Sequence, residues 1–184
     1  IESALKALNI APGLNRGFIS ETWSQIPKEV WEEERQRAKS QINKDCDFKA
    51  FGYDIDRDAL NIARENACKA GVGDRITFEQ RDIKDFSGDF PRGTVITNPP
   101  YGERLMDEDE LKLLYRDFGA MTKKLDEWCV YAITSYRAFE KYFGRRADKI
   151  RKLYNSELEC NFYQYLASPP PKTQTETERN GGKN

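Results

Sequence analysis

The chain has 184 residues, and its 30 Lys and Arg against 31 Asp and Glu give a formal net charge of −1. A protein that binds nucleic-acid phosphate with its whole surface is therefore not expected. The longest unbroken apolar run, residues 128–133, has six residues, whereas a membrane helix needs about 18. Because no secretion signal is visible either, we expect one soluble domain in the cytoplasm, without contact to a membrane.

The sequence contains no histidine, which is the most frequent general base and metal ligand near neutral pH. The four cysteines, at positions 46, 68, 129 and 160, do not form a Cys-x-x-Cys pair. Ser-His-Asp and Cys-His catalysis are therefore excluded, and we expect no metal site. Any chemistry must come from carboxylates, amides, aromatic rings or the backbone.

Hydrophobic periodicity predicts alternating helices and strands. Residues 1–9 form one apolar helical face, and Pro27 opens a second helix over residues 28–42. Further helices are expected at 57–70, capped by Asp56 and ended by Gly71, and at 107–125 and 137–143. In the second of these, Gly119 costs about 1 kcal/mol relative to Ala. Strands are expected at 48–53, 75–79, 93–97, 128–135, 149–153 and 159–166.

Strands separated by helices favour parallel pairing through right-handed crossovers. We therefore expect an α/β fold with a mostly parallel sheet and helices on both faces. The tail, residues 167–184, is led by prolines and is polar without apolar anchors, so it should be disordered.

Three polar residues follow strands at the edge where ligands of such sheets bind. Asp54 can accept hydrogen bonds from ribose hydroxyls, whereas Asp56 can cap the following helix. Asp82 can accept a hydrogen bond from an adenine amino group, although by itself it resembles an ordinary loop aspartate. Asn98 is the third, and it opens the segment Asn98-Pro-Pro-Tyr101.

The segment Asn98–Tyr101 fits the methylation of a planar exocyclic amine. The Asn98 side-chain oxygen and the Pro99 carbonyl can accept both N–H protons and turn the lone pair toward an electrophile. Pro99 and Pro100 restrict the backbone and so fix the two acceptors beforehand. Tyr101 offers a flat face on which the base can stack. The alternative is a Pro-Pro turn that only ends a strand.

Three segments carry a family resemblance: Ile96–Leu105, Leu8–Arg16 and Gly52–Asp56. They resemble the THUMP-containing bacterial methyltransferases that modify guanine N2 in large-subunit (23S) ribosomal RNA, whose relatives are often labelled N6-adenine-specific DNA methylases. The resemblance implies a Class I, Rossmann-like methyltransferase domain over residues 1–166, with a family-specific insertion at 10–45. It also implies S-adenosylmethionine as cofactor and ribosomal RNA as partner.

The resemblance carries site roles onto particular residues. It implies Asn98, Pro99, Pro100 and Tyr101 as the catalytic motif, cofactor contacts at Asp54, Ile55, Asp82 and Asn98, and substrate contacts at Tyr101 and Arg104. The family's first strand, its glycine-rich cofactor loop and its upstream THUMP region are not in this sequence. We therefore expect the 184 residues alone to bind cofactor poorly.

Two questions stay open. The function could instead be DNA adenine-N6 methylation, or the chain could be a noncatalytic part that lacks its cofactor loop. The basic residues Arg145, Arg146, Lys149, Arg151 and Lys152, interleaved with Tyr142 and Tyr154, are typical either of single-stranded RNA binding or of an ordinary solvated surface.

Overall fold

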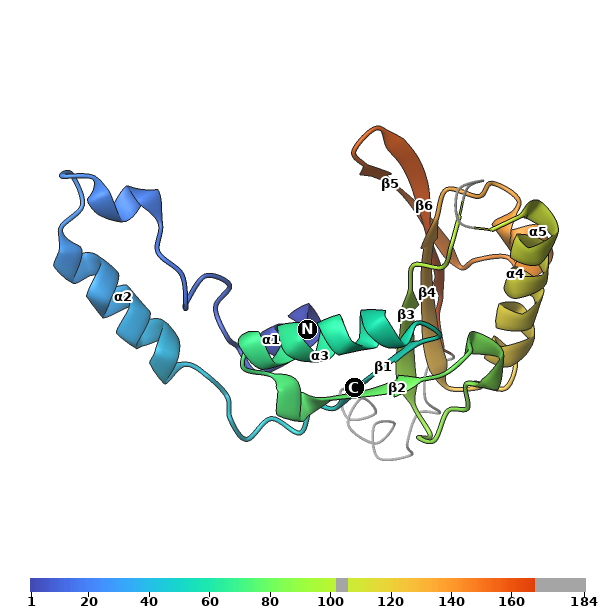
Figure 1. Ribbon diagram of the computed structural model, residues 1–184, viewed down its shortest axis with the longest axis horizontal. Coiled ribbons are helices and arrows are strands. Elements are labelled where there is room, and N and C mark those ends of the chain that lie inside the picture. The colour runs from blue at the N-terminus through green and yellow to red at the C-terminus, as the bar shows by residue number, and fades with distance from the viewer. Residues whose placement is uncertain (102–105, 168–184) are drawn as a thin grey trace, which may run out of the picture. The chain divides into compact units, whose positions relative to one another are not determined.

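The computed structural model describes residues 1–101 and 106–167, which form two compact units that divide between Asp82 and Ile83 (Figure 1). The tail predicted to be disordered lies outside the described residues from position 168 onward. Across the described ranges, no helix is long and apolar enough to cross a membrane.

The first unit pairs two parallel strands with helices. Its elements are α1 (Glu2–Ala7), η1 (Ile19–Thr22), α2 (Lys28–Ser40), β1 (Ala50–Asp54), α3 (Arg57–Lys69), η2 (Gly73–Arg75) and β2 (Ile76–Gln80). β1 and β2 pair in register, so that Asp54 lies opposite Gln80 at the carboxyl ends of both strands. β1 begins two residues later than predicted, because Phe48 packs instead against a cluster of Ala4, Leu8 and Val72.

Local signals fix the ends of α3 as the sequence predicted. The Asp56 carboxylate accepts hydrogen bonds from the backbone N–H groups of Asp58 (2.8 Å) and Ala59 (3.4 Å), which satisfies two donors of the first turn. After the helix, Gly71 adopts φ +74°, a left-handed conformation that costs glycine little. Asp54 is the last residue of β1, and Ile55 lies in the short turn between β1 and α3.

The predicted insertion at 10–45 is held together by Arg35 of α2. Its guanidinium donates hydrogen bonds to the carbonyls of Leu14 and Arg16, both at 3.1 Å, and pairs with the Glu21 carboxylate. The rings of Phe18 and Trp31 stack beside these contacts at 6.1 Å. The Arg35 side chain thus holds the segment from Leu14 to Arg16 against α2.

The second unit contains a four-stranded sheet in the order β3-β4-β6-β5. Its elements are η3 (Ile83–Asp85), β3 (Gly93–Thr97), α4 (Glu108–Thr122), β4 (Trp128–Thr134), α5 (Phe139–Phe143), β5 (Lys149–Asn155) and β6 (Leu158–Tyr165). β3 and β4 are parallel, whereas β6 runs antiparallel to β4 and β5. A tight turn joins β5 to β6, so no crossover helix is present to make that pair parallel.

The two sheets and their helices confirm the α/β fold, with parallel pairing of β1 with β2 and of β3 with β4. β3 matches its predicted range, while α4 ends three residues before Leu125 and α5 is two residues shorter than predicted. Within the described residues, β1 and β3 are both edge strands of their sheets.

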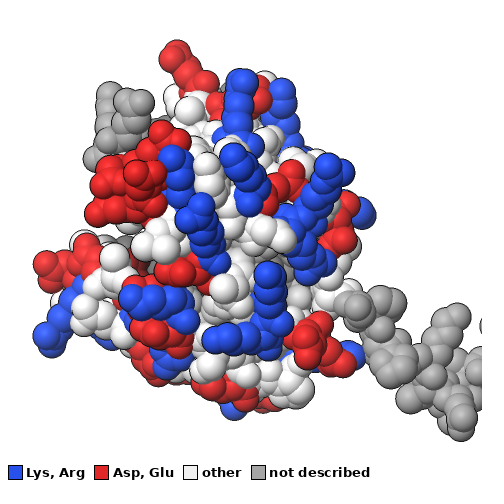
Figure 2. All heavy atoms as spheres, turned by 90° about the vertical axis from the view of Figure 1, so that its right-hand side faces the viewer, with Lys and Arg blue, Asp and Glu red and all other residues white. Residues whose placement is uncertain are grey.

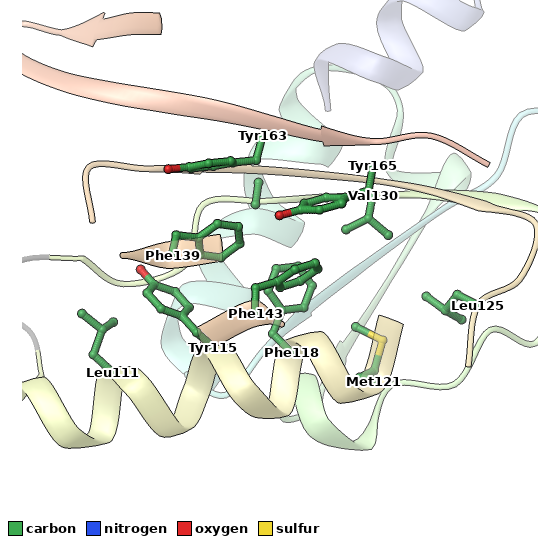
Figure 3. Close-up of a cluster of buried hydrophobic side chains, with 11 residues drawn as sticks. Leu111, Tyr115, Phe118, Met121, Leu125, Val130, Phe139, Phe143, Tyr163 and Tyr165 are labelled. Carbon is green, nitrogen blue, oxygen red and sulfur yellow. The ribbon is translucent and has the colours of Figure 1, made fainter. Parts of the chain in front are cut away.

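An aromatic core lies between one face of this sheet and the helices α4 and α5 (Figure 3). Tyr115 and Phe118 of α4 contact the ring of Phe139, at centroid distances of 4.9 and 6.4 Å. Phe139 in turn lies 4.7 Å from the ring of Tyr163 on β6. The close approach of the two helices depends on Gly119, because a Cβ there would lie 1.9 Å from the Phe143 carbonyl oxygen.

Candidate active site

The segment Asn98–Tyr101 follows β3 directly, at the carboxyl end of a strand. Asn98 is exposed, Pro99 is buried, and Pro100 and Tyr101 are half-buried. Neither the Asn98 side chain nor the Pro99 carbonyl makes a hydrogen bond to another described residue. As far as the described residues go, both oxygens are therefore open to accept hydrogen bonds.

A buried hydrogen-bond chain holds the end of this segment. The Tyr115 hydroxyl donates to the Pro100 carbonyl at 2.8 Å and lies 3.0 Å from the Thr134 hydroxyl oxygen. Since the only hydroxyl proton of Tyr115 goes to Pro100, Thr134 must donate to Tyr115. Thr134 in turn accepts a hydrogen bond from the backbone N–H of Tyr136 at 3.1 Å. The chain thus joins the end of β4 to the Pro100 carbonyl.

Burial controls the protonation of this tyrosine. Tyr115 and Thr134 are both fully buried. The pKa of Tyr115 is raised to about 12, mainly by burial. The hydrogen bond with Thr134 lowers this pKa, and the nearby phenols of Tyr136, Tyr163 and Tyr101 raise it. Tyr115 therefore stays neutral near pH 7 and keeps the proton that it donates to Pro100. It positions the loop and is not available as a general base.

In the first unit, the predicted cofactor residues share one edge of the sheet. Asp54 ends β1, and its backbone carbonyl accepts a hydrogen bond at 2.9 Å from the N–H of Arg81, the residue before Asp82. The Asp54 side chain is exposed, and its Oδ1 accepts from the Asp56 N–H at 2.9 Å. The Gln80 side chain donates to the Ile55 carbonyl at 2.8 Å. The register of β1 and β2 thus brings Asp54, Ile55 and Asp82 together.

The predicted site residues fall into two groups, one in each unit. Asp54, Ile55 and Asp82 lie in the first unit, and Asn98, Pro99, Pro100 and Tyr101 lie in the second. Arg104, the predicted substrate contact, lies outside the described residues. Over the described parts of the chain, no cluster of three or more His, Cys, Asp or Glu side chains could hold a metal ion.

Sequence reasoning missed Tyr115 and Thr134. The apolar spacing of the helix at 107–125 predicts a buried face made of Leu111, Leu114, Phe118, Met121 and Leu125. The structure buries Tyr115 as well and leaves Leu114 partly exposed. Tyr115 follows Leu111 by four residues and precedes Phe118 by three, and both spacings place it on the same helix face as these two residues. The periodicity was therefore sufficient to identify Tyr115 as a core residue. Its bond to Pro100 had no sequence signal.

The chain matches known protein families over most of its length. Residues 1–164 match the UPF0020 family model, described as an RMKL-like methyltransferase domain. YpsC of Bacillus subtilis (strain 168), whose name assigns it provisionally to the RNA methyltransferases, is 42% identical over 172 residues, which cover 94% of this chain and 45% of YpsC. The ribosomal RNA large subunit methyltransferase K/L of Shewanella baltica (strain OS185) is 39% identical over 170 residues, covering 90% of this chain and 24% of that protein.

Solved structures give the same result. SMU.472, described provisionally as a methyltransferase and crystallised with SAH, superposes with a TM-score of 0.89 at 36% identity, over 92% of this chain and 45% of its own. A structure from Clostridium difficile 630, described as a possible methylase, gives 0.88 at 48% identity, over 94% and 46%. The chain thus spans less than half the length of these relatives. The chain belongs to the UPF0020 family of RMKL-like methyltransferase domains and has their Rossmann-like α/β fold.

Proposed function

We propose that this chain is the catalytic part of an S-adenosylmethionine-dependent methyltransferase that modifies the exocyclic amine of a base in ribosomal RNA. The target that we favour is guanine N2 in 23S RNA. The names of two relatives support an RNA substrate. YpsC is provisionally named an RNA methyltransferase, and the K/L enzyme of Shewanella baltica is named a ribosomal RNA large subunit methyltransferase.

The observation that carries this proposal is the pair of oxygens at the end of β3. The Asn98 amide is exposed, and neither it nor the Pro99 carbonyl is used by another described residue. Together they can accept both protons of a flat NH₂ group and hold its lone pair out of conjugation with the ring. The hydrogen bond from Tyr115 to the Pro100 carbonyl, at 2.8 Å, supports the proposal because it restrains the backbone that carries both acceptors.

The first unit fits the cofactor at the turn after β1. The exposed Asp54 carboxylate uses one oxygen to accept from the Asp56 N–H, so its second oxygen can accept from ribose hydroxyls. The exposed Ile55 side chain, 65% accessible, offers an apolar contact for a purine ring, and Asp82 can accept from its amino group. When bound, S-adenosylmethionine supplies a methyl group on a positively charged sulfur.

Substrate placement is assigned to Tyr101 and Arg104. The half-buried Tyr101 ring can stack on a base that has left its helix. An arginine three residues later can hold a phosphate of the same nucleotide by two parallel hydrogen bonds.

The test separates chemistry from cofactor binding in the intact protein. Asn98→Ala should lower the rate of methyl transfer to 23S RNA by roughly 100- to 1000-fold while affinity for S-adenosylmethionine is retained. Asp54→Asn keeps the local acceptor but loses the charge, so it should weaken cofactor affinity instead. Asn66→Ala, at an exposed position of α3, is the matched control and should behave as wild type. Full activity of Asn98→Ala would end the proposal.

The methylated base distinguishes the alternatives. Label on guanine N2 of RNA supports the target that we favour, whereas label on adenine N6 of DNA would replace it with DNA methylation. We also propose that a segment outside the 184 residues supplies one strand and the glycine-rich loop that binds the cofactor. Calorimetry should therefore give weak binding of S-adenosylmethionine to the chain alone, and micromolar binding would contradict this part.

A further inference from the structure

A cluster of cations surrounds the Tyr142 ring in the second unit. Tyr142 lies on α5, and the charged groups of Lys112, Arg116 and Lys141 lie 6.0, 5.5 and 5.3 Å from its ring centroid. Lys112 and Arg116 are one turn apart on α4, so both face α5. The helix packing at Gly119 therefore brings three cations from two elements around one aromatic ring.

The charges in this cluster are not balanced. Lys112 pairs with Glu108 (3.1 Å) and Asp109 (3.0 Å), and these bonds raise its pKa. Arg116 and Lys141 are exposed and form no ion pair with a carboxylate of the described residues. Figure 2 shows Lys and Arg side chains gathered on the side of the second unit where α4 and α5 lie, with acidic side chains between them. Among the described residues, Arg116 and Lys141 thus have no ion-pair partner, and the three cations of the cluster face the two carboxylates of Glu108 and Asp109.

Aromatic contacts connect this cluster to the Asn98–Tyr101 segment. The ring of Tyr142 lies 6.1 Å from that of Tyr136, which lies 5.6 Å from the ring of Tyr115. Tyr115 donates to the Pro100 carbonyl at 2.8 Å. All of these residues belong to the second unit, so the cations and the proposed catalytic segment are joined by successive side-chain contacts.

The neighbouring basic stretch is only partly neutralised, because Arg146, Lys149 and Arg151 form no ion pair with a carboxylate of the described residues. Arg145 pairs with Asp148 at 3.2 Å, and Lys152 pairs with Glu159 at 3.0 Å. Two of the five cations that the sequence singled out are therefore partly neutralised. The Tyr142 cluster is distinguished by the aromatic ring held among its cations and by the ring contacts that lead from Tyr142 through Tyr136 to Tyr115.

We propose that Arg116 and Lys141, held around Tyr142, bind the phosphate backbone of single-stranded RNA next to the target base. This inference rests on the proposed function. A guanidinium binds phosphate through paired hydrogen bonds, and an aromatic ring beside it can stack on a base, a combination suited to unpaired RNA. A target base must leave its helix to reach the Asn98 oxygens, so its neighbours are unpaired as well.

The experiment measures RNA binding and turnover in the same preparations of the intact protein. The probe is a fluorescein-labelled single-stranded RNA of roughly 12 nucleotides, titrated at several salt concentrations. Arg116→Gln combined with Lys141→Gln should weaken binding about 10-fold or more. It should also reduce the salt slope by about 1.4, because each lost phosphate contact removes about 0.7. Arg116→Lys combined with Lys141→Arg keeps both charges and should retain most of the affinity.

The matched control is Lys123→Gln combined with Lys124→Gln, which makes the same charge change at the exposed end of α4. It should leave affinity and salt slope unchanged. All four substituted positions of the two Gln pairs are exposed, so circular dichroism should show folded protein in each case. The proposal would be overturned if both double Gln variants lost RNA affinity equally, or if the variant at Arg116 and Lys141 lost none. If the wild type methylates RNA and the double Gln variant at Arg116 and Lys141 binds RNA normally, only the proposed RNA-binding surface is refuted. If the wild type does not methylate RNA, the proposed function is refuted.

Discussion

Replacing Tyr115 with Phe removes one oxygen and keeps the ring, so it tests the buried hydrogen-bond chain directly. In the wild-type chain, Tyr136 donates to Thr134, Thr134 to Tyr115 and Tyr115 to Pro100. The substitution leaves the Thr134 hydroxyl without its acceptor and the Pro100 carbonyl without its donor. The aromatic contact to Phe139 at 4.9 Å is preserved, which limits the effect to polar groups.

The expected magnitude follows from these two unsatisfied groups. Leaving a buried polar group without its partner costs about 1–3 kcal/mol, and Thr134 is fully buried. We expect the free energy of unfolding to fall by an amount in this range. If the same free energy is lost from the positioning of Asn98 and Pro99, kcat for methyl transfer falls roughly 5- to 150-fold, while KM for RNA stays close to wild type.

The assays are urea denaturation followed by circular dichroism, and steady-state methyl transfer in the intact protein. Thr134→Val is the comparison, because it removes the middle of the chain but keeps the bond from Tyr115 to Pro100. It should lose similar stability and retain most of kcat. Wild-type kcat and stability in Tyr115→Phe, or an equal fall of kcat in Thr134→Val, would refute the positioning role.

Two further predictions concern packing and protonation. Gly119→Ala should lower the urea midpoint, because a Cβ lying 1.9 Å from the Phe143 carbonyl oxygen forces α4 and α5 apart. This cost outweighs the gain of about 1 kcal/mol in helix propensity. Gly17→Ala, where a Cβ meets nothing within 4 Å, is the control, and a stabilised Gly119→Ala variant would contradict the packing. Stability should also fall as the pH rises from about 10 to about 12, because unfolded tyrosine ionises near 10 whereas the pKa of buried Tyr115 is raised to about 12. This tyrosine accounts for about 3 kcal/mol of the loss, which Tyr115→Phe should remove; an unchanged pH dependence in that variant would contradict it.

Much of the fold could be predicted because its signals are local. Asp56 accepts from N–H groups two and three residues ahead, and Gly71 takes its left-handed φ within one turn, so both ends of α3 are readable in sequence. The prolines after Asn98 likewise end β3 at the predicted residue. Placing Asp54, Asp82 and Asn98 after strands needed only these element boundaries, and their roles in binding and catalysis stay predictions.

Only the tertiary structure decided the contacts between residues that are far apart in the chain. Tyr115 reaches Pro100 and Thr134, 15 and 19 residues away, and no periodicity encodes such a bond. Gly119 reads in sequence as a weak point of a helix, yet its missing side chain is what lets α5 approach. The sequence by itself thus determined which segments are helix or strand and which polar residues follow the strands. Packing decided which side chains hold that loop and which cations stay unpaired, because burial and charge balance depend on neighbours that only folding brings together.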